Sequence, residues 1–177
     1  MKIIIINTLI GKGGAALLTE VLTEKLIKNY GVELSFIVKE NKKENTDSIF
    51  SMNGMKIPAG YRKFSRILSE SGFQNCYLPL EFHFIVNKVK EIKPDLIHLH
   101  NIHGGYFQTN LIKKLCKIAP VVWTFHDMFP ITGHCAHAFE CKKWITGCGK
   151  CPHLEIYPAL KKDWTAFLWK HKNRIFN

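Results

Sequence analysis

Four cysteines lie within 17 residues of one another, at Cys135, Cys141, Cys148 and Cys151. Thiolates at this density are ligands that zinc prefers, and the closing C-x-x-C pair is the tight turn of many zinc knuckles. A site closed by four thiolates has no open coordination position, so it would hold an irregular loop together rather than catalyse. The spacing predicts structural zinc, with free or transiently oxidised thiols and an iron–sulfur cluster as alternatives.

Three histidines with H-x-H-x-x-H spacing occupy residues 98–103. On a strand, His98 and His100 point to the same side, and His103 lies in the loop beyond. We expect His98 to face into the structure and His100, an exposed strand-end residue, to meet a substrate and accept a hydroxyl proton. A metal-dependent hydrolase that uses all three histidines is an alternative, although Ile102 stands where metallo-β-lactamase-type enzymes have aspartate.

A glycine-rich turn is expected at Gly11, Gly13 and Gly14. Glycines let the backbone approach a ligand, and the free N–H groups of a following helix favour an anion. The run is not G-x-G-x-x-G, and no acidic residue ends the second predicted strand, which argues against a bound dinucleotide. The turn predicts a nearby phosphate or sugar, with a tight turn that binds nothing as the alternative.

The pair Tyr157 and Lys161 fits the Y-x-x-x-K spacing of short-chain dehydrogenases. That pair needs a helix, which Pro158 permits only in a first turn, and the companion T-G-x-x-x-G-x-G motif is absent. We interpret the match as chance.

The elements that would position these residues alternate along the chain. Strands are expected at 3–6, 32–38, 96–100 and 121–125, and helices at 15–30, 61–70, 80–92 and 106–118. The composition of residues 40–60 predicts little regular structure there. In the first helix Leu18, Val21, Leu22 and Leu26 are expected to share one apolar face, opposite Glu20, Glu24 and Lys28.

Strands separated by helices predict an α/β fold with a parallel sheet and right-handed crossovers. Ligands of such sheets bind at the carboxyl ends of the strands. The glycine-rich turn, the segment 100–105 and the pair His126 and Asp127 all follow predicted strands. These three candidate sites therefore fall on one rim of the sheet.

The charge balance is strongly basic, with 25 Lys and Arg against 14 Asp and Glu. Nucleic acid, an anionic membrane face or phosphorylated small molecules are partners that fit this balance. A zinc-stapled nucleic-acid module is an alternative, but the four tryptophans lie in apolar patterns typical of a core. The short apolar run at residues 3–6 does not fit a signal peptide, and no run is long enough to span a membrane. We expect a soluble, cytoplasmic protein.

Several segments together resemble a known family. Residues 97–106 and 120–128 resemble bacterial family-four glycosyltransferases, and residues 132–135, 144–152 and 167–170 extend the resemblance to the cysteine-bearing, colanic-acid-type subgroup. The match spans nearly the whole chain, and the combination is far more specific than any one motif.

The resemblance implies a GT-B fold, which has two Rossmann-like halves with the active site between them. Residues 1–177 would form the N-terminal, acceptor-side half, with a cysteine-rich irregular insertion at about 128–155. The donor-binding half, with its paired glutamates spaced E-x7-E, would lie beyond residue 177. This half alone would turn over little or nothing.

The family transfers a sugar from a nucleotide-sugar donor, with retention and without a catalytic metal. The implied acceptor is a growing surface polysaccharide or a lipid-linked glycan. From the basic charge balance we expect peripheral contact with the anionic inner face of the cytoplasmic membrane, and we expect no binding of nucleic acid.

The resemblance also implies roles for residues by motif. The turn at Gly11, Gly13 and Gly14 falls where the family brings a glycine-rich loop near the donor phosphates. His100 ends the strand whose last histidine faces the reacting sugar, which makes it the expected catalytic residue. The remaining expected substrate-binding residues are Asn101, His103, His126 and Asp127.

Overall fold

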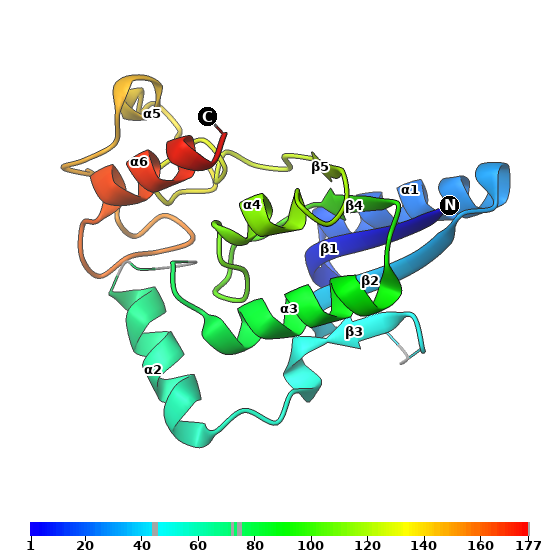
Figure 1. The fold of residues 1–177 in the computed structure, drawn as a ribbon. Helices are drawn as coiled ribbons and strands as arrows, with labels where there is room; N and C mark the ends of the chain where they lie inside the picture. Colours follow the sequence, from blue (N-terminus) through cyan, green and yellow to red (C-terminus); the bar gives the residue numbers. More distant parts are fainter. Residues whose placement is uncertain (44–45, 72, 74–75, 177) are drawn as a thin grey trace. The chain divides into compact units, whose positions relative to one another are not determined.

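The computed structural model describes residues 1–43, 46–71, 73 and 76–176. In these residues five parallel strands form one sheet in the order β3-β2-β1-β4-β5 (Figure 1). The strands are β1 Lys2–Ile10, β2 Glu33–Asn41, β3 Ile49–Ser51, β4 Leu96–Leu99 and β5 Val121–Trp123. The predicted α/β class with a parallel sheet is confirmed.

Helices connect most of these strands. They are α1 Gly14–Tyr30, α2 Ala59–Glu70, α3 Pro79–Ile92, α4 Leu111–Leu115, α5 Lys143–Thr146 and α6 Thr165–Phe176, with a 3₁₀ turn, η1, at Met52–Gly54. Helix α1 contacts β1 and β2, whereas α3 contacts α4. In Figure 1, α3 lies in front of the sheet and α1 behind it. Helices on both faces are what a parallel sheet requires.

The central strand β1 supplies the middle of the core. Ile4, Ile5 and Ile6 are fully buried, as expected for a continuous apolar run covered on both faces. Ile5 lies opposite His98 on β4, and Ile6 lies opposite Leu99. Each such isoleucine stabilises the fold by roughly 1.5–3 kcal/mol.

Two predicted elements differ from the structure. Residues 40–60 contain β3 and η1, because the short apolar pair Ile49 and Phe50 joins β2 at the sheet edge. The helix expected at 106–118 shortens to α4. The chain from Tyr106 to Thr109 is buried without helical structure.

The predicted apolar face of α1 is only half covered. Leu18 is 57% exposed and Val21 is 49% exposed, whereas Leu22 and Leu26 are partly buried and Leu26 packs against the core of the sheet. The most deeply buried residues of this helix are Ala16, Thr19 and Thr23. These small or β-branched side chains are not singled out by a hydrophobicity pattern.

The described residues divide into two compact units. The first comprises Met1–Lys56, Pro79–Ile102 and Leu111–His126, and it contains the sheet with α1, α3 and α4. The second comprises Ile57–Leu78, His103–Asn110 and Asp127–Asn177, and it contains α2, α5 and α6. Residues 128–155, all of which the structure describes, include one short helix, α5.

Candidate functional site

His100 follows the last residue of β4, and its side chain is hydrogen-bonded inside the first unit. Its Nδ1 lies 2.7 Å from Nε2 of His126 and 3.1 Å from Oγ1 of Thr19 on α1. The Thr19 hydroxyl donates its own proton to the carbonyl of Ala15, so it accepts from His100. We therefore assign the ring proton of His100 to Nδ1, which leaves the lone pair on Nε2.

The expectation that His100 is an exposed strand-end residue is wrong. His100 is 2% exposed, less than the 9% of His98, and the two rings lie 4.2 Å apart on the same side. The backbone of His100 is fixed as well, because its N–H donates to the carbonyl of Ile6 and its carbonyl accepts from the indole N–H of Trp123. His98 is buried as expected, with Nε2 2.8 Å from Oγ1 of Thr124.

Burial sets the protonation state of these rings. Burial, reinforced by the neighbouring His98 and His126, lowers the pKa of His100 to about 3. Burial also lowers the pKa of His98, with His126 as a further cause. His100 is therefore neutral at physiological pH. In the part of the chain that the structure describes, its buried Nε2 has no hydrogen-bond partner.

His103 forms a different network, in the second unit. Its Nε2 lies 2.9 Å from Oδ2 of Asp127, and its Nδ1 lies 3.3 Å from the hydroxyl of Tyr157. The carboxylate accepts from Nε2–H, so Nδ1 is the acceptor for the hydroxyl of the phenol. The other carboxylate oxygen of Asp127 accepts the N–H of Phe129, which fixes its orientation. His103 is buried and Tyr157 is 57% exposed, so the network reaches the surface through the phenol.

Tyr157 is the residue that sequence analysis missed. Its spacing to Lys161 is meaningless, as expected, since residues 157–161 form no helix. Its partner His103 is 54 residues away in the chain. Burial and the charge of Asp127 raise the pKa of Tyr157, so the phenol keeps its proton. No local pattern could have identified this pair.

The glycine-rich turn precedes α1 in the first unit. Gly11 has φ of +84°, a conformation that favours glycine, and its N–H donates to Oε1 of Glu20 at 2.8 Å. Lys43 pairs with the same carboxylate at 2.7 Å. Burial opposes ionisation of Glu20, but the hydrogen bonds from Lys43 and Gly11 outweigh it and lower its pKa. Gly13 and Gly14 have open space where a side chain would project.

The backbone of Asn101 is hydrogen-bonded to β1, the strand that leads into the glycine-rich turn. Its N–H donates to Oδ1 of Asn7 at 3.3 Å, and its carbonyl accepts the hydroxyl of Thr8 at 3.0 Å. Asn7 and Thr8 belong to β1, so the end of β4 is anchored to the central strand. Of the expected catalytic and substrate-binding residues, the first unit contains Gly11, Gly13, Gly14, His100, Asn101 and His126, and the second contains His103 and Asp127.

The four clustered cysteines line one pocket of the second unit, which we call the cysteine pocket: Cys135, Cys141, Cys148 and Cys151. All four are half-buried and free of disulfides. Burial raises the pKa of three of these thiols, those of residues 135, 148 and 151. Within residues 1–43, 46–71, 73 and 76–176, no group of three or more His, Cys, Asp or Glu side chains is placed so that it could hold a metal ion.

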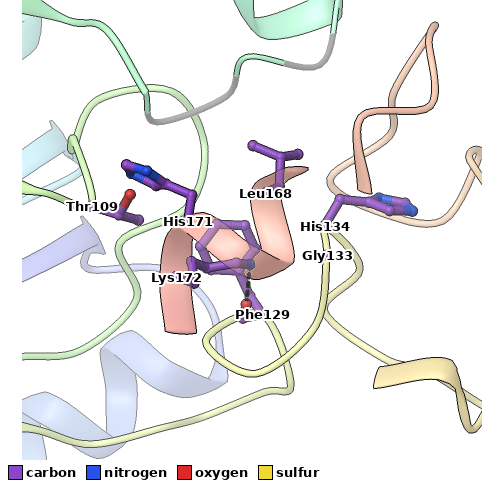
Figure 2. A pocket seen from close by; sticks show the side chains of 7 residues that line it. All are labelled: Thr109, Phe129, Gly133, His134, Leu168, His171 and Lys172. Atoms are coloured by element: carbon purple, nitrogen blue, oxygen red, sulfur yellow. Dashed lines mark hydrogen bonds between the residues drawn. The ribbon is translucent and has the colours of Figure 1, made fainter. Parts of the chain in front are cut away.

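A neighbouring pocket of the same unit contains a buried lysine (Figure 2). Lys172 on α6 is 4% exposed, donates to the carbonyl of Phe129 and lies 3.9 Å from the centroid of its ring. Burial lowers the pKa of Lys172 to about 7, while the thiols of Cys148 and Cys135 act in the opposite direction. Gly133 and His134 line both this pocket and the cysteine pocket.

Comparison with known proteins points to one class. No family model matches the chain. A stretch of 90 residues, 47% of the chain, is 33% identical to a protein of Escherichia coli (strain K12) provisionally described as a colanic acid biosynthesis glycosyl transferase, WcaC. The match covers 22% of that protein's length. The similarity supports a relation to glycosyltransferases of polysaccharide biosynthesis. Among the described residues, no helix has the length and apolar character needed to cross a bilayer.

Proposed function

We propose that this chain is the acceptor-binding half of a retaining GT-B glycosyltransferase of the colanic-acid-type subgroup. The full enzyme would move a sugar from a nucleotide-sugar donor to a growing surface polysaccharide or a lipid-linked glycan. The five-stranded parallel sheet and the partial similarity to a named glycosyl transferase support this proposal. The sequence resemblance across the cysteine segment supports the assignment to the colanic-acid-type subgroup.

The buried, unpartnered Nε2 of His100 is the observation that carries the proposal. It belongs to the residue at the carboxyl end of β4, where ligands of parallel sheets bind. A neutral ring with its proton on Nδ1 accepts a hydrogen bond from a substrate hydroxyl at Nε2. His126 and Thr19 hold the ring in that tautomer. We assign catalytic assistance in the transfer to His100, which accepts the hydroxyl proton or its hydrogen bond.

The network of Asp127, His103 and Tyr157 is proposed to bind the acceptor. Asp127 orients His103, and His103 accepts the proton of the Tyr157 hydroxyl. This arrangement leaves the lone pairs of the phenol oxygen to accept a hydrogen bond from a sugar hydroxyl. The role is one of positioning, since the raised pKa of Tyr157 keeps the phenol protonated.

The donor phosphates are assigned to the turn at Gly11, Gly13 and Gly14. Helix α1 begins at Gly14 without a side-chain cap and without an acidic residue in its first turn. Its first N–H groups are suited to an anion. Lys12 adds positive charge to the same turn.

The basic composition supports binding of the enzyme to an anionic membrane surface. The formal net charge is +11, which favours phosphorylated ligands and the anionic lipids of the inner face of the cytoplasmic membrane. We place the enzyme in the cytoplasm with peripheral membrane contact and without a nucleic-acid partner. The only metal assigned to it is structural zinc, and the reaction itself needs none.

The proposal is tested by titrating the histidine-labelled chain with UDP- and GDP-linked hexoses and with a soluble diphosphate-linked saccharide. We expect NMR shift changes at the imidazoles of His100 and His126 on addition of at least one of these compounds. The exposed His83 provides an internal control that should not respond.

The same preparation distinguishes the other classes. A salt-dependent gel shift with random oligonucleotides, without a response of His100 to any sugar, would replace the proposal with a nucleic-acid module. Metal-dependent hydrolysis that depends on His98, His100 and His103 would replace it with a hydrolase.

A further inference from the structure

The four thiols of the cysteine pocket line one space, together with Gly133 and His134. Residues 135–151 fold so that thiols from separate turns face one space. The segment has one helical turn, α5, and few buried apolar side chains. Ordinary core packing therefore contributes little to holding it.

Backbone groups are aimed at the sulfur atoms. The N–H of Gly133 donates to Sγ of Cys148 at 3.2 Å. A Cβ at Gly133 would lie 2.7 Å from Cβ and 2.8 Å from the carbonyl oxygen of Thr165 on α6, so only glycine permits this approach. Amide donors to sulfur are typical second-layer groups around metal-bound thiolates.

The C-x-x-C turn is tied to α6 by a carboxylate. Asp163 accepts the N–H of Cys151 at 2.7 Å and the N–H of Thr165 at 3.0 Å. The position of Cys151 is thus set by the start of the helix that also contains Lys172. Metal ligands need such outside support to keep their geometry.

We propose that Cys135, Cys141, Cys148 and Cys151 bind one zinc ion as thiolates, drawing together around it from positions that do not form a metal-binding group in this structure. Each thiol releases its proton to solvent, four S–Zn bonds form, and no electron is transferred. This inference holds whichever reaction the full enzyme performs.

Metal content tests the site directly. The purified 177-residue chain should contain close to one equivalent of zinc by elemental analysis. Cobalt exchanged into it should give the d–d bands of a tetrahedral sulfur site. Cys148→Ser should lose the metal, whereas Cys116→Ser, at an exposed cysteine of the first unit, should retain it. Zinc-free protein with freely titratable thiols, or iron with labile sulfide, would overturn the proposal.

A second pair of variants tests which side chains are the zinc ligands. Nε2 of His134 lies 3.5 Å from Sγ of Cys151, and its Nδ1 lies 2.9 Å from the carbonyl of Pro158. We expect Cys151→Ser to lose zinc and His134→Gln to retain it. The reverse result would show a site with three cysteines and His134, and the four-thiolate assignment would be wrong.

Discussion

His100 and His103 are three residues apart in the chain but belong to different units, and their surroundings differ in kind. His100 is enclosed by two other imidazoles and a hydroxyl, and burial keeps it neutral with a pKa of about 3. His103 is paired to the carboxylate of Asp127 and contacts a half-exposed phenol. The unit boundary crosses the chain between residues 102 and 103 and again between 126 and 127.

The two environments prepare the same side chain for different tasks. A neutral imidazole with an unused lone pair is suited to accept a proton. A carboxylate-bound imidazole is held in one tautomer and one orientation, which suits it to position another group. The units also differ in the interactions that stabilise their folds. A buried isoleucine strand holds the first, whereas close contacts and polar side chains hold the loops of the second.

The largest expected effect comes from crowding the second unit. Gly133→Ala should destabilise it by about 3 kcal/mol, because the added methyl collides with backbone and side chain of Thr165. Gly14→Ala in the first unit meets open space at the start of α1 and should change stability by less than about 1 kcal/mol. Denaturant unfolding and hydrogen exchange report the two units separately. Equal losses in both variants would contradict the difference in packing.

The second-largest expected effect is a loss of stability of the first unit at acid pH. The folded pKa of His100 is about 3 and its ordinary value is 6.5, so the unfolded chain takes up a proton that the folded chain refuses. Its contribution is complete above pH 6.5 and is lost as the pH falls toward 3. By about pH 5 the loss is roughly 2 kcal/mol, measured by urea unfolding against about pH 7.5. His100→Gln should lose less, and an equal loss would remove His100 as the cause.

Replacing the two histidines should separate their roles. In the full enzyme, His100→Gln should lower kcat by at least about tenfold, because an amide can hydrogen-bond but cannot take a proton. His103→Gln should mainly raise the KM for the acceptor. Initial-rate kinetics with varied acceptor give both values. If both variants lowered kcat alike, the distinction between the two histidines would fail.

The smallest effect is expected at the surface end of the second network. Tyr157→Phe removes one hydroxyl and should raise the KM for the acceptor by about three- to fivefold, with kcat nearly unchanged. Tyr77→Phe is a matched control, since Tyr77 is 56% exposed in the same unit. Steady-state kinetics of both variants decide the matter. A similar change in KM for both would show that the Tyr157 hydroxyl has no specific role.

The alternation of apolar runs was sufficient to predict the sheet. The β-branched run of β1 and the strands that precede His100 and His126 are local signals, and all three strands exist. The short strand β3 escaped prediction because its pairing with β2, rather than its own three residues, makes it a strand. The most deeply buried residues of α1 escaped because a hydrophobicity pattern does not single out small or β-branched side chains.

The candidate site was only partly predictable for a related reason. The sequence indicates that His98 and His100 share a side, but the position of His100 also depends on hydrogen bonds with Trp123 and Ile6 of other strands. The clustering of the cysteines is local and was visible. Lys172 and Tyr157 become notable only through partners 43 and 54 residues away.

The carboxylate of Glu20 occupies the amide of Gly11, in the turn assigned to the donor phosphates. Glu20 is therefore a tethered competitor, present at high effective concentration, and an incoming phosphate must displace it from Gly11. Lys43, which now pairs with that carboxylate, would be released to bind the phosphate in its place. The turn thus exchanges one anion for another with little change in local charge. Weak binding of free phosphate follows, together with preference for a larger ligand that makes further contacts.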